Sequence, residues 1–387
     1  MFTKKKVWLA LLTLIALGGI AYWQHRTVLA HYYVRQLAGA YGDHREEWAK
    51  KAASVDDAAV PLVLDNLASS DPIVCGNMSA ALFHVAKNAG FSHLRTVELA
   101  EQVKGRFAGF STPGQEKTLL AWTRIMQDHQ KARGQDGGAE EQDRNAKPLP
   151  APLTKVISSI LIESEKQNEL RGASLLLAAE LVDCVQPGQW VDACRAMAER
   201  GLGDPLPGTR AAAIQLLLRQ PMRGDKELLA KVVPLLRDKA APVRRAALLA
   251  LAAEADVARD ESLLPFLHDD DPEMQEICQM AMRKRGLTDD DLRLARMISD
   301  PSPATRVRVV LHFHRLPDLN LSAWLRQLSH DASPLVRAAA VRAAGDYPHV
   351  DLAERLRELA STDPDETVRL NAQHYLAARA APALPER

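Results

Sequence analysis

The sequence has few cysteines, no net charge and none of the short motifs that mark common catalytic sites. Four cysteines in 387 residues cannot build a disulfide framework. The 49 basic and 49 acidic side chains cancel, which argues against a protein that coats nucleic acid, because such proteins have a strongly basic surface. With 47% hydrophobic residues the chain is not that of a disordered protein, and it is long enough for two domains or one elongated array.

Motifs for catalysis and metal binding are also missing. The sequence has no glycine-rich phosphate loop, no Gly-x-Ser-x-Gly elbow and no His-Glu-x-x-His pair, so we expect neither enzymatic activity nor a cofactor. His312 and His314 are two residues apart, and on a helix such positions point about 200° apart, too far to hold one metal ion. The acidic runs 269–271 and 289–291 lack a calcium-loop pattern, and we expect them to cap helices.

The N-terminus contains a stretch of 17 residues without a charge. Three lysines, at positions 4–6, precede this stretch, which covers residues 7–23 and ends on Tyr22 and Trp23. As a helix it would be roughly 26 Å long, at the short end of what crosses a bilayer. Aromatic rings favour the membrane interface, and lysines favour the cytoplasmic side. We predict a single transmembrane helix, with the bulk of the chain outside the cytoplasm, facing the periplasm if the cell is bacterial.

A cleaved signal peptide is the alternative interpretation of this segment. A basic start, an apolar core and small residues at Gly19 and Ala21, or later at Ala30, also fit a secretory signal. We favour the anchor because the apolar run continues past Gly19 into aromatic residues. Both interpretations place the body of the chain outside the cytoplasm.

One basic or amide position recurs through the second half of the chain. Its members are Arg210, Arg244, Gln275, Arg306, Arg337 and Arg369. Successive members are 34, 31, 31, 31 and 32 residues apart, a period that holds one helical hairpin. A leucine-rich stretch before each position has the spacing of a helix, and the alanine-rich stretch after it is suited to close helix packing. The pattern predicts an all-α array of hairpins.

Asp-Pro pairs are predicted to mark the turns between the two helices of a hairpin. Proline ends the first helix, and the acidic side chain can cap the second. The pairs are Asp71-Pro72, Asp204-Pro205, Asp271-Pro272, Asp300-Pro301 and Asp363-Pro364.

These Asp-Pro-x-Val-Arg turns and proline-bearing first helices resemble the HEAT-repeat family, including the HEAT-like repeats first noted in phycobilin lyases. The resemblance covers Asp204 to Leu376, and an earlier unit at Asp71-Pro72 has Cys75 in place of the arginine. The resemblance implies an α-solenoid with an extended concave surface, but no single activity. The predicted segments are a cytoplasmic stub (1–6), the transmembrane helix (7–23), an N-terminal helical region with HEAT-like repeats (24–132), a flexible linker (133–152), a C-terminal HEAT-repeat solenoid (153–380) and a tail (381–387).

Basic residues predominate on the predicted second helices, which line the concave face in the resembled family. From residue 209 to 379 they carry fourteen basic and four acidic residues, and five of those arginines occupy the repeat position. A mildly basic groove for an acidic protein partner is therefore one hypothesis, and a solvated face with balancing charges is the alternative. The candidate binding residues are Arg283, Lys284, Arg285, Arg308, Arg315 and Arg342.

Cys184 and Cys194 flank a predicted turn, where antiparallel helices could bring them close enough for a disulfide in an oxidising compartment. Buried free thiols are the alternative.

We predict a membrane-anchored scaffold that binds a protein partner. The alternatives are a secreted adaptor, a structural spacer, and an enzyme or nucleic-acid-binding protein of the glycosylase or lyase type. We expect no nucleic-acid partner, because DNA repair conflicts with export.

Overall fold

A computed structural model describes residues 24–90, 94–135, 149–182, 190–220, 222–311, 313, 321–347 and 350–380. Within these ranges the regular secondary structure is helical throughout, which confirms the all-α prediction. The chain divides into two compact units, residues 1–228 and 229–387, which are described separately below.

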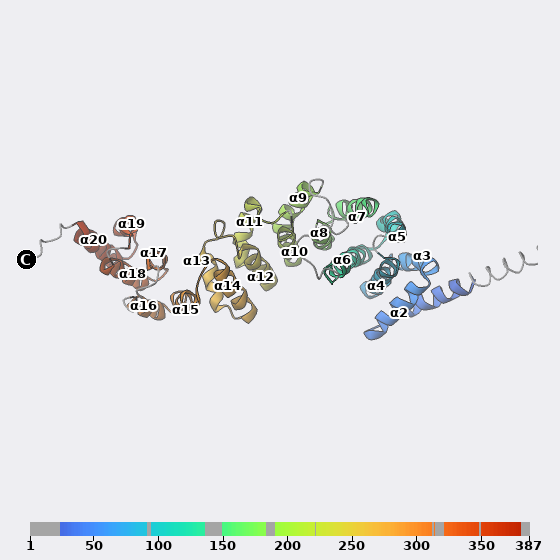
Figure 1. The fold of residues 1–387 in the computed structure, drawn as a ribbon, viewed down its shortest axis with the longest axis horizontal. Coiled ribbons are helices and arrows are strands. Elements are labelled where there is room, and N and C mark those ends of the chain that lie inside the picture. The colour runs from blue at the N-terminus through green and yellow to red at the C-terminus, as the bar shows by residue number, and fades with distance from the viewer. Residues whose placement is uncertain are drawn as a thin grey trace, which may run out of the picture. The chain divides into compact units, whose positions relative to one another are not determined.

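The first unit is a succession of packed helices, beginning with a helix over residues 24–38. Its further helices are α2 (Asp43–Ser54), α3 (Asp56–Asn66), α4 (Pro72–Ala89), α5 (Leu94–Arg106), a 3₁₀ turn at Phe107–Gly109, α6 (Thr112–Gln135), α7 (Ala151–Ser164), α8 (Arg171–Val182), α9 (Val191–Leu202) and α10 (Pro207–Leu217). The second helices of successive pairs, α2, α4, α6, α8 and α10, each pack against the next in this order (Figure 1). The first helices α3, α7 and α9 pack against the helix that follows each of them.

Stacking in the first unit continues across the predicted linker 133–152. Residues 136–148 of this linker lie outside the described ranges, while its flanks belong to the end of α6 and the start of α7. Helix α5 packs against α7, and α6 packs against α8. The amide of Gln127 donates to Glu180 Oε1 at 3.1 Å, and the amide of Gln130 donates to the Glu180 carbonyl at the same distance. The helices before and after the predicted linker therefore belong to one stack.

The second unit repeats the helix pairing. Its helices are α11 (Lys226–Val232, which contains the division between the units), α12 (Ala241–Leu251), α13 (Asp260–Leu263), α14 (Pro272–Lys284), α15 (Asp289–Ile298), α16 (Pro303–Val310), α17 (Leu321–Leu328), α18 (Pro334–Asp346), α19 (Ala353–Thr362) and α20 (Glu366–Ala380). Helix α12 packs against α14, α16 against α18, and α18 against α20. Such pairwise packing is consistent with a HEAT-like solenoid.

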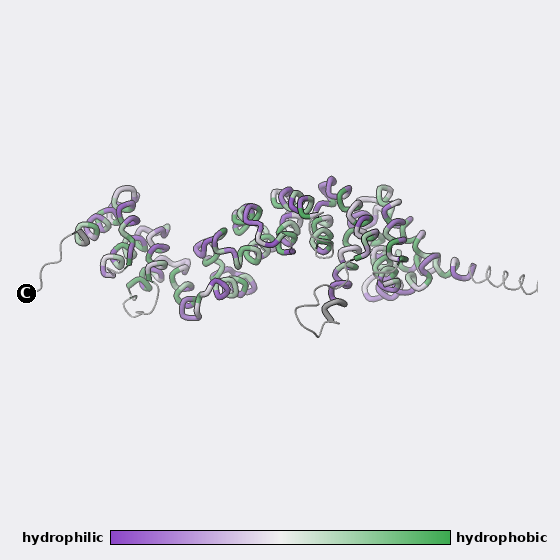
Figure 2. The backbone as a smooth tube through the Cα atoms, turned by 45° about the horizontal axis from the view of Figure 1, so that its top comes forward, coloured by the Kyte–Doolittle hydropathy of each residue, from purple (hydrophilic) through white to green (hydrophobic). Residues whose placement is uncertain are grey.

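Apolar and polar residues alternate along most helices, as the green and purple stretches of the tube in Figure 2 show, while α4 and α8 are buried along most of their length. The core consists of leucine, alanine and valine side chains from both helices of a pair. In the second unit Leu325, Leu328, Val336 and Val341 are at most 1% exposed. Burial of this kind contributes about 25 cal/mol per Å² of apolar surface and is the main force that holds one pair on the next.

Proline changes the winding of two first helices. At Pro234 helix α11 passes into a 3₁₀ segment, Val233–Arg237, and at Pro265 helix α13 passes into another, Leu264–His268. Proline has no N–H to donate to the carbonyl four residues earlier, so the α-helical pattern cannot continue through it. The two prolines therefore stand at the same change of winding, one repeat apart.

The predicted stub 1–6, transmembrane helix 7–23 and tail 381–387 lie outside the described residues. Among the helices that are described, none combines the length and the apolar character that a membrane span requires.

Candidate functional site

The recurring basic or amide side chain closes each turn by the same contact. In every repeat it donates to the backbone carbonyl six residues earlier, at 2.5–3.1 Å. Carbonyls at the end of a helix lack partners within that helix, and the side chain supplies one. The pairs are Arg210 with Asp204, Arg244 with Asp238, Gln275 with Asp269, Arg306 with Asp300, Arg337 with Asp331, and Arg369 with Asp363.

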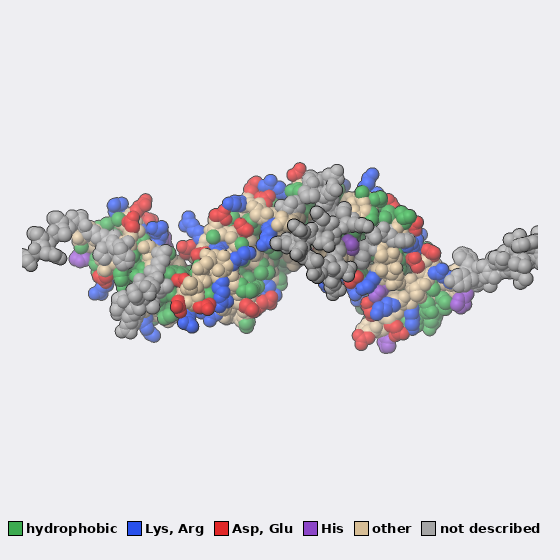
Figure 3. All heavy atoms as spheres, viewed as in Figure 1, with side chains coloured by type: hydrophobic (Ala, Val, Ile, Leu, Met, Phe, Trp, Pro, Cys, Tyr) green, Lys and Arg blue, Asp and Glu red, His purple; other side chains and the backbone are tan. Residues whose placement is uncertain are grey.

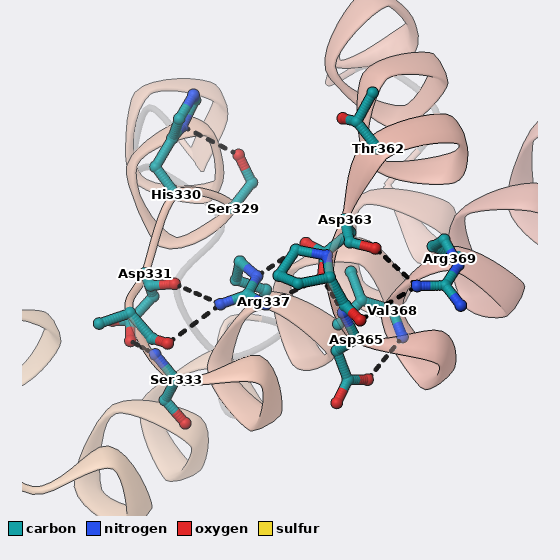
Figure 4. Close-up of polar contacts among 12 residues, drawn as sticks. Ser329, His330, Asp331, Ser333, Arg337, Thr362, Asp363, Asp365, Val368 and Arg369 are labelled. Atoms are coloured by element: carbon teal, nitrogen blue, oxygen red, sulfur yellow. Dashed lines mark hydrogen bonds and ion pairs between the residues drawn. The ribbon is translucent and has the colours of Figure 1, made fainter.

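Some of these arginines also connect one repeat to the next. Arg306 binds both carboxylate oxygens of Asp331, at 2.7 and 2.8 Å. Arg337 binds Asp363 in the same way (Figure 4). In the first unit Arg171, which is not one of the recurring residues, makes a comparable contact with Asp204 at 2.7 Å. Arg306 and Arg337 thus join neighbouring repeats of the second unit.

The Asp-Pro pairs occupy two different positions, although the sequence analysis treated them as one. Asp71 and Asp271 cap the second helix, which begins at the proline itself. Asp204, Asp300 and Asp363 lie two residues earlier in the turn, where each carboxylate accepts the backbone N–H two residues ahead at 2.8–2.9 Å. An aspartate satisfies an unpaired N–H at either position, which is why the dipeptide appears in both.

The turn between α3 and α4 uses a thiol in place of the arginine. Cys75 Sγ is 3.1 Å from the carbonyl of Ser69, six residues earlier, and Ser69 Oγ accepts the N–H of Asp71. Ser69 and Cys75 therefore stand where later repeats have aspartate and arginine. A thiol cannot form the ion pair to a neighbouring repeat that arginine forms.

The predicted binding residues separate into exposed and buried groups. Lys284, Arg308 and Arg342 are exposed, as is Arg283, which forms an ion pair with Asp289 at 3.0 Å. Arg315 lies outside the described residues.

Arg285 does not fit its predicted role. Its side chain is 3% exposed, and it donates to the carbonyls of Leu251, Ala252 and Ala258 and to Asp260 at 2.6–2.9 Å. Arg285 stabilises the preceding turn, because its guanidinium donates hydrogen bonds to three backbone carbonyls there. Arg285 is not available to a partner.

A hollow that the sequence analysis missed opens on the second helices of the first unit, across α2, α4 and α6. Its first lobe has a volume of about 400 Å³. Twelve described residues line it, and none of them is acidic. Three are basic: Arg45 on α2, and Lys117 and Arg124 on α6. The remaining lining residues are Pro72, Ile73, Gly76, Asn77, Ser79, Ala80, Phe83, Leu120 and Ala121.

Small residues of α4 create the depth of this first lobe. A Cβ placed on Gly76 would meet no atom within 4 Å, so the space beside it is open. The Gly76 carbonyl accepts Arg45 Nη2 at 2.9 Å and Ser79 Oγ at 2.7 Å. The bond from Arg45 holds its guanidinium at the edge of the lobe.

The second lobe adjoins the first and measures about 510 Å³. It adds Lys50, Lys87 and Lys131, together with two carboxylates, Glu46 and Asp128. Lys87 Nζ lies 3.2 Å from Asp128, so this carboxylate is balanced within the lobe.

Glu46 connects all three helices of the hollow. It lies 2.7 Å from His84 Nε2 and 3.6 Å from an Arg124 nitrogen. Partial burial raises the pKa of the Glu46 carboxyl, but the hydrogen bond with His84 and the charges of His84 and Arg124 outweigh burial, so the pKa falls below its ordinary value. Glu46 is therefore ionised at neutral pH, and the net charge of the hollow is positive.

Phe83 and Arg124 form the wall that both lobes share. The guanidinium carbon of Arg124 lies 4.0 Å from the centroid of the Phe83 ring, within the range of a cation–π interaction. This stacking leaves the guanidinium edge open to hydrogen bonds.

The sequence contained a signal for this hollow in the spacing of its lining residues. Lys117, Arg124 and Lys131 are seven residues apart on α6, and Ile73, Ala80 and Lys87 are seven apart on α4. Residues at this spacing share one face of a helix. The repeat pattern does not reveal them, because it depends on the recurring arginine, which this part of the chain lacks.

Across the face shown in Figure 3, basic and acidic side chains are interspersed. The acidic runs act as helix caps: Asp271 accepts the N–H of Glu273 at 3.0 Å, and Asp291 forms a capping box with Thr288. Among the described residues, histidine, cysteine and carboxylate side chains do not gather into a metal-binding group. Cys194 is a free thiol, and burial raises its pKa to about 11, while Cys184, its predicted partner, lies outside the described residues.

Comparison with curated proteins gave no match to this chain. A scan against protein families matched residues 291–377, the segment from α15 to α20, to the family described as HEAT repeats. This segment contains three helix pairs and the two ion pairs between repeats, Arg306 with Asp331 and Arg337 with Asp363, which we call the arginine ladder. Over residues 291–377 the chain carries HEAT repeats.

Proposed function

We propose that the chain is a scaffold that binds a protein partner on its second helices. The observation that carries this proposal is the hollow over α2, α4 and α6, whose lining contains six basic side chains and two carboxylates. HEAT repeats typically mediate protein binding, and stacked pairs expose a long surface for their size. The proposal assigns no catalytic step and no cofactor to the chain.

The second unit supports the same interpretation by itself. Lys284, Arg308 and Arg342 are exposed on second helices, and basic side chains at a surface attract an acidic partner. Arg337 and Arg306 are buried or half-buried and bind the aspartates of the next repeat. We therefore assign binding to the exposed arginines and stability to the ladder.

We also propose that residues 7–23 anchor the scaffold in a membrane, with the remainder extracytoplasmic. The uncharged run behind Lys4, Lys5 and Lys6 supports this proposal. A cleaved signal peptide would instead yield a soluble adaptor. Cell fractionation with an intact mass separates the two: an uncut chain in the membrane fraction supports the anchor, and a soluble chain that lacks its first 21 to 30 residues contradicts it.

Site-specific photo-crosslinking in cells tests the binding proposal. A benzoylphenylalanine is placed at Lys87 or Arg342, which are exposed on second helices, or at the matched first-helix positions Glu101 and Arg357, which are also exposed. We expect one protein to be captured from Lys87 or Arg342 and not from Glu101 or Arg357. Capture only from the first helices, or equally from both, would refute the proposal.

A further inference from the structure

We propose that the hollow over α2, α4 and α6 binds a short acidic peptide segment in which an apolar side chain is flanked by carboxylates. This inference rests on the proposed function and specifies the chemistry of the partner at this site. Both lobes, of about 400 and 510 Å³, fall in the range of about 300–1,000 Å³ that is typical of ligand sites.

The first lobe selects for a negative charge. Arg45, Lys117 and Arg124 converge on it, and its described lining contains no carboxylate. Outside that lining, Glu46 lies 3.6 Å from Arg124 and Glu116 lies 3.5 Å from Lys117, so Arg45 is the cation of this lobe that most favours an added carboxylate. The Nε atom of Arg45 is enclosed and has no hydrogen-bond partner, while Nη2 is bound to the Gly76 carbonyl. A guanidinium fixed in this way loses little conformational entropy when it pairs with a carboxylate.

An apolar side chain fits between the charges. Ile73 is 48% exposed on α4, and Leu120 of α6 lines the same lobe, so apolar surface lies beside the cations. Covering such a surface contributes about 25 cal/mol per Å². A ligand that carried only charge would leave it exposed to water.

The second lobe explains why a peptide suits the hollow better than a nucleic acid. Lys50 and Lys131 add positive charge there, but Glu46 and Asp128 lie among them. A polymer with a phosphate at every step would bring negative charge against these carboxylates, whereas a peptide can place its acidic residues only where the cations lie. The ligand therefore has separated carboxylates and an apolar residue between them.

A peptide selection on the full-length chain tests the inference. A library of random twelve-residue peptides displayed on phage is selected on the chain held in lipid nanodiscs. We expect the enriched peptides to carry two or more acidic residues around a leucine, isoleucine or aromatic residue. Enrichment of peptides without acidic residues, or no enrichment at all, would overturn the inference.

Filling the first lobe supplies a variant with a matched control. Gly76→Leu places a side chain in the open space of α4, and Gly105→Leu does the same on α5, where a Cβ also meets nothing within 4 Å. We expect Gly76→Leu to weaken binding of an enriched, fluorescently labelled peptide by about tenfold, which corresponds to about 1.4 kcal/mol, and Gly105→Leu to leave it unchanged. Equal effects of the two substitutions would contradict the site.

A charge variant keeps the test valid if Gly76→Leu fails to fold. Lys117→Glu reverses a charge in the first lobe, and Lys104→Glu does so at an exposed position of α5. Only Lys117→Glu should weaken binding of the labelled peptide. Equal competition by a short single-stranded DNA would show attraction to any polyanion and would also overturn the inference.

The two proposals fail in different ways. Crosslinking from Arg342 without selection of acidic peptides refutes the inference alone. Selection of acidic peptides, with no cellular protein crosslinked from either second-helix position, refutes the proposed function and leaves the peptide site.

Discussion

The guanidinium of Arg337 donates to both carboxylate oxygens of Asp363, with each nitrogen–oxygen distance at 2.8 Å. Arg337 lies on α18, and Asp363 ends α19, so the pair joins two successive repeats (Figure 4). The Arg337 and Asp363 side chains are only 11% and 3% exposed. Losing one partner would leave the other charge buried without compensation.

Replacing Arg337 should destabilise the second unit. We expect Arg337→Ala to lower the free energy of unfolding by about 3 kcal/mol, because a buried pair is broken. Arg342→Ala, on the exposed side of the same helix, should change it by less than about 0.5 kcal/mol. Hydrogen exchange of α18 and α20, followed by mass spectrometry, measures both. Similar exchange in the two variants would mean that the ladder does not hold these repeats together.

The same pair predicts a dependence of stability on pH. Burial raises the pKa of the Asp363 carboxyl, but its bonds with Arg337 and with the N–H of Asp365 lower the pKa by more than burial raises it. The pKa of Asp363 therefore lies below its ordinary value. The folded state then binds the proton less tightly than the unfolded state. The stabilisation is complete above the unfolded pKa of about 3.9 and is lost as the pH falls through the folded value.

Unfolding with urea between pH 7 and pH 3 checks this dependence. Asp363→Asn removes the titrating group, so the variant should lose less stability than the natural chain over this interval. A parallel loss in both chains would assign the acid sensitivity to other carboxylates.

Sequence reasoning identified the all-α class and the ladder positions because both depend on local order. The interval of about 31 residues returns each arginine to the same place in its repeat, and the carbonyl it binds is always six residues away. A contact set by such a short separation can be recognised in the sequence. The HEAT repeats matched over residues 291–377 belong to this regular part.

The hollow and the role of Arg285 could not be predicted in the same way. Glu46, His84 and Arg124 are about 40 residues apart in sequence, and only the stacking of three helices brings them together. Arg285 stands at the end of a basic run that looks exposed, yet it folds back on carbonyls 27 to 34 residues earlier. The helical period places the lining residues of the hollow on one face of each helix, but which helices meet, and where Arg285 folds back, depends on tertiary packing.

Arg285 and Arg283 offer a test of this distinction. Arg285→Ala leaves several buried carbonyls without a donor, each worth about 1–3 kcal/mol, so we expect a loss of about 3 kcal/mol in stability. Arg283→Ala removes only an exposed ion pair with Asp289 and should cost less than about 1 kcal/mol. Thermal unfolding followed by circular dichroism compares the two. If Arg283→Ala proved the more damaging, the assignment of Arg285 to the turn would be wrong.

Gly114 is predicted to be intolerant of a side chain. A Cβ at this position would lie 1.9 Å from the carbonyl oxygen of Leu67, which forces α6 away from the preceding turn. We expect Gly114→Ala to destabilise the first unit by about 2 kcal/mol. At Gly105, in an open part of α5, alanine should instead stabilise it by about 0.5–1 kcal/mol. Urea unfolding measures the change in stability of each variant. A change of the same sign in both variants would contradict the close approach of Gly114 to the Leu67 carbonyl.

The buried cysteines should resist alkylation while the chain is folded. Burial raises the pKa of Cys194 to about 11 and that of Cys278 to about 12, so little thiolate forms at pH 8. We expect iodoacetamide to modify both only after unfolding in urea, as shown by peptide mass mapping. Mapping without reductant also tests the predicted Cys184–Cys194 disulfide, since a linked peptide would appear in place of two separate ones.

The direct packing of α5 on α7 and of α6 on α8 means that covalent continuity between α6 and α7 is not what holds the first unit together. Two fragments, one ending after Gln135 and one starting before Ala151, would share a buried interface of their own. When the two fragments are expressed separately, we expect them to associate through this interface and to form the same stack of helices. The chain is thus a natural candidate for a split reporter, and we expect a foreign domain placed between α6 and α7 to leave the packing of α5 on α7 and of α6 on α8 intact.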